Sequence, residues 1–213
     1  MNKRHAFTLI EMLVVIAIIG IVAALVVNMN SGAQTAKRNA QVNAGKNKLT
    51  LLIDEYQSKL NFYPPDNGLL AAQSPGSYYD AVAATNPLIY ELTGATNTTN
   101  GYIQLFDGSS NTTSGTSGTY YAVFGRASVQ NANTDEPHSF YIPQPKEYTN
   151  YSGSSLEGLL VPVSLTNDPT FHNFWHYDAS SPNRHNLSSY DLWAEYISAG
   201  KGGSNIITTN GNW

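Results

Sequence analysis

The sequence predicts an α+β fold, in which one long N-terminal helix with a hydrophobic first half packs on a small antiparallel β-sheet domain. Three observations lead to this prediction. An unbroken apolar run covers Met12–Val27, apolar residues continue at helical spacing as far as Leu60, and the segment after Pro64-Pro65 holds short strand-like runs separated by turn residues. We therefore expect a long helix followed by a mixed domain.

The composition is that of a folded protein with an uncharged polar surface. The 213 residues are 41% hydrophobic and 12% charged, whereas an average soluble domain has roughly 25% charged residues. The formal net charge is -4 and no block of basic residues occurs, so nucleic-acid binding is not expected. The absence of cysteine excludes disulfides, iron–sulfur clusters and zinc sites built on cysteine.

Residues 7–27 are long and apolar enough for a helix that crosses a bilayer, which needs about 20 residues. Lys3 and Arg4 precede the run, so the positive-inside rule places the N-terminus in the cytoplasm and the rest of the chain across the membrane. A secretory signal peptide is the alternative, but no Ala-x-Ala site follows the run at a suitable distance. Glu11 also differs from a plain signal, because a carboxylate within an apolar span usually has a partner.

Residues 28–60 have the pattern of an amphipathic helix that continues the apolar one. Gly20 and the cluster 28–32 are its expected weak points, since Gly costs about 1 kcal/mol relative to Ala in a helix interior. Gly20 has an alternative role in close packing between helices. The predicted apolar face comprises Ala33, Ala36, Ala40, Ala44, Leu49, Ile53, Tyr56 and Leu60.

Residues 61–213 form the predicted globular domain. Pro64-Pro65 ends the long helix, and a second short helix is expected between Asn86-Pro87, as N-cap and first helical residue, and Gly94 at its C-terminal end. A loop rich in Thr, Asn, Ser and Gly is expected around the first strand. The strand-like runs are 102–106, 120–124, 139–142, 159–163, with Pro162 suited to an edge, and 190–194.

The segment Ala6–Gly20, AFTLIEMLVVIAIIG, closely resembles the class III signal of type IV pilins and of type II secretion pseudopilins. The resemblance implies a pilin-like fold and a leader, residues 1–6, that a prepilin peptidase removes between Ala6 and Phe7. It also implies methylation of the new N-terminal Phe7 and a role for Glu11 in subunit assembly. The family usually has Gly before the cut, and Ala6 is still a small residue, so we expect processing that is slower rather than absent.

The same resemblance implies a structural subunit and not an enzyme. It implies a single-pass protein of the bacterial inner membrane, with residues 61–213 in the periplasm, that later lies in a pseudopilus or an extracellular filament. The implied partners are further copies in a helical filament, the prepilin peptidase, an inner-membrane platform protein, an assembly ATPase and minor pseudopilins. No cofactor is expected.

The last part of the chain resembles, more loosely, the major pseudopilin of type II secretion. The matching features include Phe174-Trp175, Tyr190-Asp191-Leu192 and Asn212-Trp213. Type IV pilins usually fasten this region with a disulfide, which a chain without cysteine lacks, and this favours the pseudopilin. The resemblance implies a calcium ion held by Asp side chains, but no acid occurs after Glu195, so no calcium is expected.

Other groups of reactive residues do not indicate a catalytic or metal site. His172, His176 and His185 lie close in sequence, and the first two have the i, i+4 spacing of a helical zinc site, but their neighbours are typical of a loop. The adjacent carboxylates at 54–55 and at 135–136 point in different directions in a helix or a strand, whereas an acid/base pair needs convergent geometry.

The sequence therefore favours a structural subunit that polymerises. The alternative from another class is a membrane-anchored adhesive or ligand-binding surface module, which 14 Tyr and 3 Trp would suit. An envelope hydrolase ranks third, because no catalytic constellation is present in the sequence. Secretion, adhesion, motility and DNA uptake are all compatible with these features, as are a major and a minor subunit.

Overall fold

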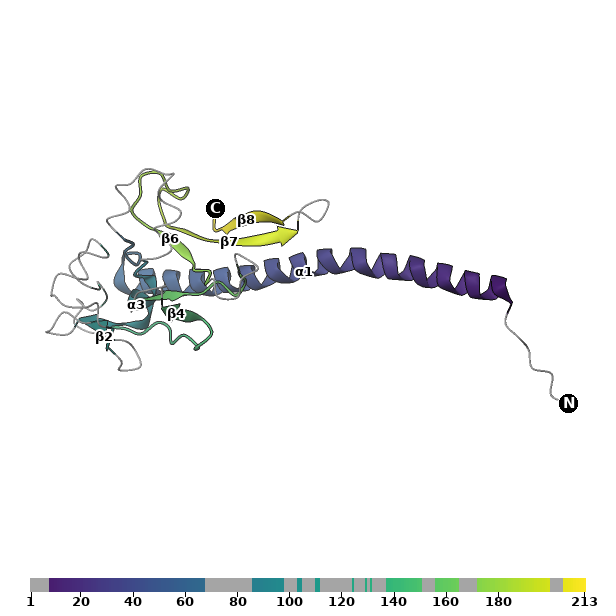
Figure 1. Cartoon of the computed structure of the whole chain (residues 1–213). Coiled ribbons are helices and arrows are strands. Elements are labelled where there is room, and N and C mark those ends of the chain that lie inside the picture. The colour runs from purple at the N-terminus through teal and green to yellow at the C-terminus, as the bar shows by residue number, and fades with distance from the viewer. Residues whose placement is uncertain are drawn as a thin grey trace.

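The computed structural model describes residues 8–67, 86–97, 103–104, 110–111, 124, 129, 131, 137–150, 156–164, 172–199 and 205–213. Figure 1 shows a long helix, α1, whose second half is covered by the other described elements while its first half projects away from them. The elements are α1 (Leu9–Leu60), α3 (Leu88–Thr93), β1 (Thr96–Asn97), β2 (Ile103–Gln104), β3 (Ser110–Asn111), β4 (Tyr148–Asn150), β5 (Glu157–Leu159), β6 (His176–Asp178), β7 (Asp191–Ala199) and β8 (Asn205–Gly211). The structure confirms the predicted α+β, pilin-like layout.

The helix α1 has 52 residues and is about 80 Å long. It runs through Gly20 and Gly32 without a break, so neither glycine ends or interrupts it. At its end Asn61 takes a left-handed conformation, with φ 65°, and donates its N–H to the carbonyl of Gln57 at 2.8 Å. Two buried prolines follow, which have no N–H to continue the helix. The predicted end at residue 60 is confirmed.

One face of the second half of α1 enters the core, but it begins later than the sequence predicts. Burying such an apolar side chain contributes about 1.5–3 kcal/mol, so this face accounts for much of the attachment between helix and domain. The fully or almost fully buried residues of this face are Val42, Leu49, Ile53 and Tyr56. The four predicted alanines Ala33, Ala36, Ala40 and Ala44 are exposed instead. Helical periodicity predicted this face, but between residues 33 and 44 the described domain contacts α1 through polar side chains such as Arg38 and Asn39, so these alanines stay at the surface.

The short helix α3 forms where the sequence predicts it. Its start is one residue later than predicted, because Pro87 is the N-cap and Leu88 the first helical residue. Asn86, the predicted N-cap, lies just before the cap, and its side chain accepts the N–H of Leu88 at 2.9 Å. Gly94 ends the helix with φ 73°, a conformation that favours glycine. A Cβ at Gly94 would lie only 2.7 Å from the carbonyl oxygen of His138, so close packing also requires glycine there.

Within the described ranges all strand pairs are antiparallel, in three small sheets with the orders β1-β2-β3, β4-β5 and β6-β7-β8. An isolated bridge between Leu160 and Phe174 links the second sheet to the third. The hairpin β7–β8 lies along α1, and polar side chains of the helix hold it there (Figure 1). Arg38 donates to the carbonyl of Ile197 at 2.9 Å, and Lys46 donates to the carbonyl of Gly211 at 2.6 Å.

Two predicted strands need correction, two are confirmed, and one lies almost wholly outside the described residues. Residues 139–142 form no strand, because the N–H groups of Phe140 and Tyr141 both bond to a carbonyl of α3, that of Leu92. The strand predicted at 159–163 is instead β5, which ends at the first of these residues. Of the run 120–124 only Phe124 is described, so the strand predicted there stays a prediction. The predictions at 102–106 and 190–194 are confirmed by β2 and β7, and β7 is longer than predicted.

A buried histidine packs between the strands of the third sheet. The ring of His176 stacks on that of Trp193, with centroids 4.9 Å apart and an angle of 10° between the planes. Its Nδ1 atom is buried without a hydrogen-bond partner among the described residues. Burial disfavours the charged ring and lowers the pKa of His176 to about 4. The folded protein therefore keeps this histidine neutral well below the pH at which an exposed histidine is protonated.

Acid should weaken the fold through His176. The imidazole of His176 binds a proton near pH 6.5 in the unfolded chain but only near pH 4 in the folded protein. The stability that the neutral ring contributes is therefore complete above pH 6.5 and is lost as the pH falls to 4. Over that window the free energy of unfolding should drop by about 3 kcal/mol because of this one residue. His176→Phe keeps a flat ring but binds no proton, so it should show a much smaller drop in denaturant titrations of the detergent-solubilised chain at pH 7 and pH 4. The exposed His172→Phe is the control, and an equal drop in all three proteins would contradict the assignment.

Candidate assembly site

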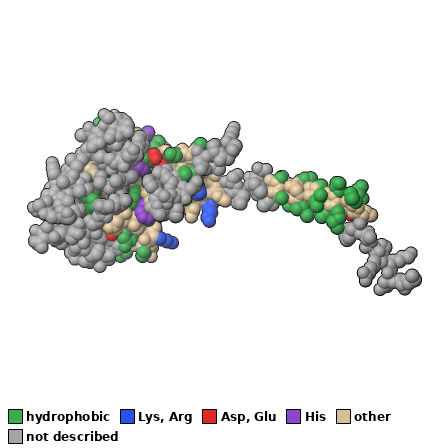
Figure 2. All heavy atoms as spheres, viewed as in Figure 1, with side chains coloured by type: hydrophobic (Ala, Val, Ile, Leu, Met, Phe, Trp, Pro, Cys, Tyr) green, Lys and Arg blue, Asp and Glu red, His purple; other side chains and the backbone are tan. Residues whose placement is uncertain are grey.

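The first half of α1 exposes a continuous apolar surface. Figure 2 shows hydrophobic side chains along the projecting rod of the helix. Large exposed patches of this kind mark surfaces that meet another protein or a membrane. Exposure of the large side chains ranges from 45% at Val15 to 84% at Leu9. The residues are Leu9, Ile10, Met12, Leu13, Val14, Val15, Ile16, Ile18, Ile19, Ile21 and Val22.

Nothing in the described chain covers this surface. A Cβ placed at Gly20 would meet no atom within 4 Å. No segment of the described chain therefore packs closely against this glycine. A neighbouring helix could approach the backbone of α1 closely at this position, because glycine has no side chain. The alternative role of Gly20, in packing between helices, therefore needs a second molecule.

Glu11 lies in the first turn of α1 and is the one ionisable residue of the segment 9–24. Its Oε2 atom accepts the N–H of Thr8 at 2.7 Å and the hydroxyl of Thr8 at 2.9 Å. In return, the N–H of Glu11 donates to the Thr8 hydroxyl oxygen at 3.3 Å. The two residues form a capping box, which satisfies two of the N–H groups that every helix start leaves without an internal partner.

Thr8 is the residue of this site that the sequence predictions did not single out. A Ser or Thr followed three residues later by Glu, directly before an apolar run, is the sequence signature of a capping box, and Thr8-Leu9-Ile10-Glu11 has it. The Oε1 atom of Glu11 makes no hydrogen bond to any described residue. The carboxylate thus holds its own helix start with one oxygen and leaves the other for a further donor.

The remaining predicted site residues, Ala6 and Phe7, lie outside the described residues, as does the leader 1–6. Among the helices of the described chain, none has an apolar stretch that is long enough to cross a membrane. The span over residues 7–27 thus stays a prediction.

The three histidines of the sequence analysis do not come together as a metal site. His172 is exposed, His176 is buried on β6 against Trp193, and His185 lies in the loop before β7, where its ring stacks on Trp213. Residues four apart in an extended segment are about 13 Å apart, so the i, i+4 spacing has no helical meaning here. Within the described ranges no group of three or more acidic or histidine side chains is placed to hold a metal ion.

The carboxylates named above as surface groups are only partly described. Asp54 and Glu55 are exposed on α1, and the hydroxyl of Tyr190 lies 3.5 Å from an oxygen of Asp54. The pair at 135–136 lies outside the described residues.

Comparison with known proteins identifies the N-terminal segment alone. The family model for the prokaryotic N-terminal methylation motif matches residues 1–27. No curated protein and no solved structure matches the chain. The motif is a type IV pilin-like prepilin signal, and it indicates a substrate of a prepilin peptidase that assembles into a filament. It points to a structural subunit rather than an enzyme.

Removing the Thr8 cap should loosen the start of α1. Thr8→Ala loses the hydroxyl that the N–H of Glu11 reaches, which typically costs about 1 kcal/mol, whereas Thr8→Ser keeps it. Hydrogen exchange of the Glu11 and Met12 amides, measured on the chain in detergent micelles, should be about fivefold faster in Thr8→Ala than in Thr8→Ser. Equal exchange rates in the two variants would mean that the capping box contributes nothing.

Proposed function

We propose that this chain is a structural subunit of a type II secretion pseudopilus or a related type IV pilus-like filament, processed by a prepilin peptidase. The observation that carries the proposal is the exposed apolar half of α1, whose large side chains at 9–22 lie within the matched motif of residues 1–27 and have no partner in the described chain. Such a surface is expected to lie in a lipid bilayer first and in the apolar core of a filament afterwards. The covered half of α1 then presents the folded domain on the outside.

The proposed organisation follows the change of surroundings along the chain. Residues 1–6 are the leader, 7–27 the span and filament core, 28–60 the amphipathic helix, and 61–213 the domain in the periplasm or on the filament surface. Copies of the same chain are the main partners. The peptidase, an inner-membrane platform protein, an assembly ATPase and minor pseudopilins are the others that the prepilin signal implies.

In the assembly step we propose that Glu11 of one subunit binds the free N-terminal amine of Phe7 in the next. An unpaired charge in an apolar filament core is costly, and removing one partner of a buried ion pair typically costs about 3–5 kcal/mol. The Oε1 atom, which has no hydrogen bond to a described residue, supports this role, because Glu11 can accept the amine there while Oε2 keeps the cap at Thr8. The pair would set the axial step between neighbouring subunits.

Between the two kinds of filament, the residues favour the pseudopilus. A chain without cysteine lacks the disulfide with which type IV pilins usually close their C-terminal region. The described hairpin β7–β8 is closed by hydrogen bonds to α1 and by aromatic contacts instead. Filaments recovered with a type II secretion machine, but not with a pilus machine, would support the narrower assignment.

Processing gives the first test of the proposal. Cells that contain a prepilin peptidase should yield a chain whose intact mass starts at Phe7 and includes one methyl group. Ala6→Gly should leave the cut unchanged or make it faster in a pulse-chase experiment, because glycine suits the position before the cut. Recovery of full-length protein alone, with the peptidase present and active on a known prepilin, would show that residues 1–6 are not a leader.

Glu11→Gln separates the charge of this residue from its capping role. Glutamine also serves as the third helical residue of a capping box, so the helix start should stay intact while the negative charge is lost. The variant, expressed as the sole copy, should insert and be cleaved, and its filament yield should fall at least tenfold, consistent with a loss of about 1.4 kcal/mol or more per contact. The control is Glu55→Gln on the exposed part of the same helix, with unchanged yield. Normal filaments from Glu11→Gln would show that Glu11 acts through the cap or as a headgroup-facing topology marker.

A further inference from the structure

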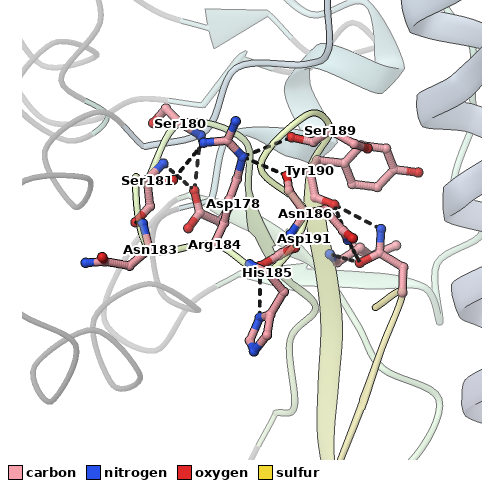
Figure 3. Close-up of polar contacts among 12 residues, drawn as sticks. Asp178, Ser180, Ser181, Asn183, Arg184, His185, Asn186, Ser189, Tyr190 and Asp191 are labelled. Atoms are coloured by element: carbon pink, nitrogen blue, oxygen red, sulfur yellow. Dashed lines mark hydrogen bonds and ion pairs between the residues drawn. The ribbon is translucent and has the colours of Figure 1, made fainter.

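The loop that joins β6 to β7 is ordered by buried carboxylates at both of its ends (Figure 3). At one end an oxygen of Asp178 accepts the N–H groups of Ser180 and Ser181 at 3.1 and 2.8 Å. At the other end Asp191 accepts the N–H groups of His185 and Asn186 at 2.6 and 2.9 Å. Each acid thus fixes backbone N–H groups of the loop. Two loop carbonyls accept backbone N–H groups as well, that of Ser181 from Arg184 at 3.4 Å and that of Asn186 from Ser189 at 3.1 Å.

The side chain of Arg184 adds hydrogen-bond donors for four backbone carbonyls of the loop. Its guanidinium lies inside the loop, and each hydrogen bond that its side chain makes within the described chain goes to a backbone carbonyl. The distances are 3.0 Å from Nε to Asn186, 3.1 Å from Nε to Ser189, 2.7 Å from Nη1 to Ser181 and 2.5 Å from Nη2 to Leu187. Convergence of carbonyl oxygens on one positive charge is the environment that proteins otherwise build for hard metal cations.

The loop 181–189 also contacts the C-terminal residues that follow β8. Next to Arg184, the ring of His185 stacks on Trp213, with centroids 4.0 Å apart and an angle of 5° between the planes. Trp213 covers Gly211, where an added Cβ would lie 2.5 Å from the ring, and it meets Trp193 edge-on at 5.8 Å. The loop around Arg184 therefore closes the last residues of β8 onto β7.

The calcium ion implied by the resemblance to the major pseudopilin does not fit these residues. Calcium takes six to eight oxygen ligands, carboxylates prominent among them, and no acid follows Glu195 in the sequence. The carboxylates of Asp178 and Asp191 bind backbone N–H groups. The carbonyl oxygens of the adjoining loop already surround a guanidinium, whose charge would repel a cation placed beside it.

We infer that the guanidinium of Arg184 is a built-in cation for the loop 181–189, and that it gives closure of the C-terminal hairpin, and with it filament assembly, independence of divalent metal ions. The part that concerns assembly rests on the function proposed above. The part that concerns closure depends only on the contacts of this loop.

The closure is tested on the full chain in detergent, by thermal melts with and without EDTA. The wild-type midpoint should shift by less than about 1 °C on adding EDTA. Arg184→Met should lower the midpoint by roughly 5–10 °C and reduce the near-ultraviolet circular dichroism of the stacked tryptophans. Arg184→Lys keeps the charge but not the planar array of donors, so its midpoint should lie between those of the wild type and Arg184→Met. Arg38→Met is the matched control, because Arg38 donates to the single carbonyl of Ile197.

Two results would overturn the inference. One is a wild-type midpoint that falls by about 5 °C or more with EDTA, which would place a metal ion in the closed structure. The other is a melting midpoint of Arg184→Met that is no lower than the midpoint of Arg38→Met. If Arg184→Met does not accumulate, the comparison of Arg184→Lys with Arg38→Met decides in the same way.

Filament yield from wild-type cells grown with and without chelator tests the second part. Equal yields support metal-independent assembly, and a chelator-dependent loss contradicts it. Failure to form any filament under either condition would count against the proposed function, while the melts would still report on Arg184. The two proposals therefore fail in different measurements.

Discussion

One helix has to satisfy two different surroundings along its length, and the rest of the structure follows from that constraint. The second half of α1 offers Val42, Leu49, Ile53 and Tyr56 to a core that belongs to the same chain. The first half exposes its large apolar side chains, and no described residue covers them. A domain that wrapped both halves would leave no surface for insertion or assembly, so the fold is confined to one half and the other half awaits a partner.

Four of the 11 Lys and Arg residues donate hydrogen bonds to specific groups of the described chain. Arg38 and Lys46 hold the hairpin β7–β8 on α1 through backbone carbonyls, and Arg184 orders the loop before it. Lys48 pairs with Glu147 at 2.7 Å. Burial acts to raise the pKa of Glu147, but hydrogen bonds from Lys48, a backbone N–H and a tyrosine hydroxyl bring it down to about 2. In a protein with only 12% charged residues, these side chains thus serve to attach separate parts of the described fold to one another.

The features that could be predicted are those set by neighbouring residues. The ends of α1 and α3 follow from proline, asparagine and glycine within a few positions, and the capping box at Thr8 had a readable signature as well. The segment 139–142 has strand composition but bonds to Leu92, a partner that only the folded chain supplies. Likewise, the strand β8 and the set of backbone carbonyls around Arg184 depend on groups that the fold brings together. No local sequence pattern predicts which of these groups meet.

The unbroken course of α1 has a mechanical consequence. A helix without a proline or a break behaves as a stiff shaft, and bends in such helices are gentle and spread over many turns. Because no break separates the covered half of α1 from its apolar half, a rotation or a pull applied to the domain is transmitted along the helix to the apolar end. A partner that held only the domain could therefore move the apolar half as well, without contacting it.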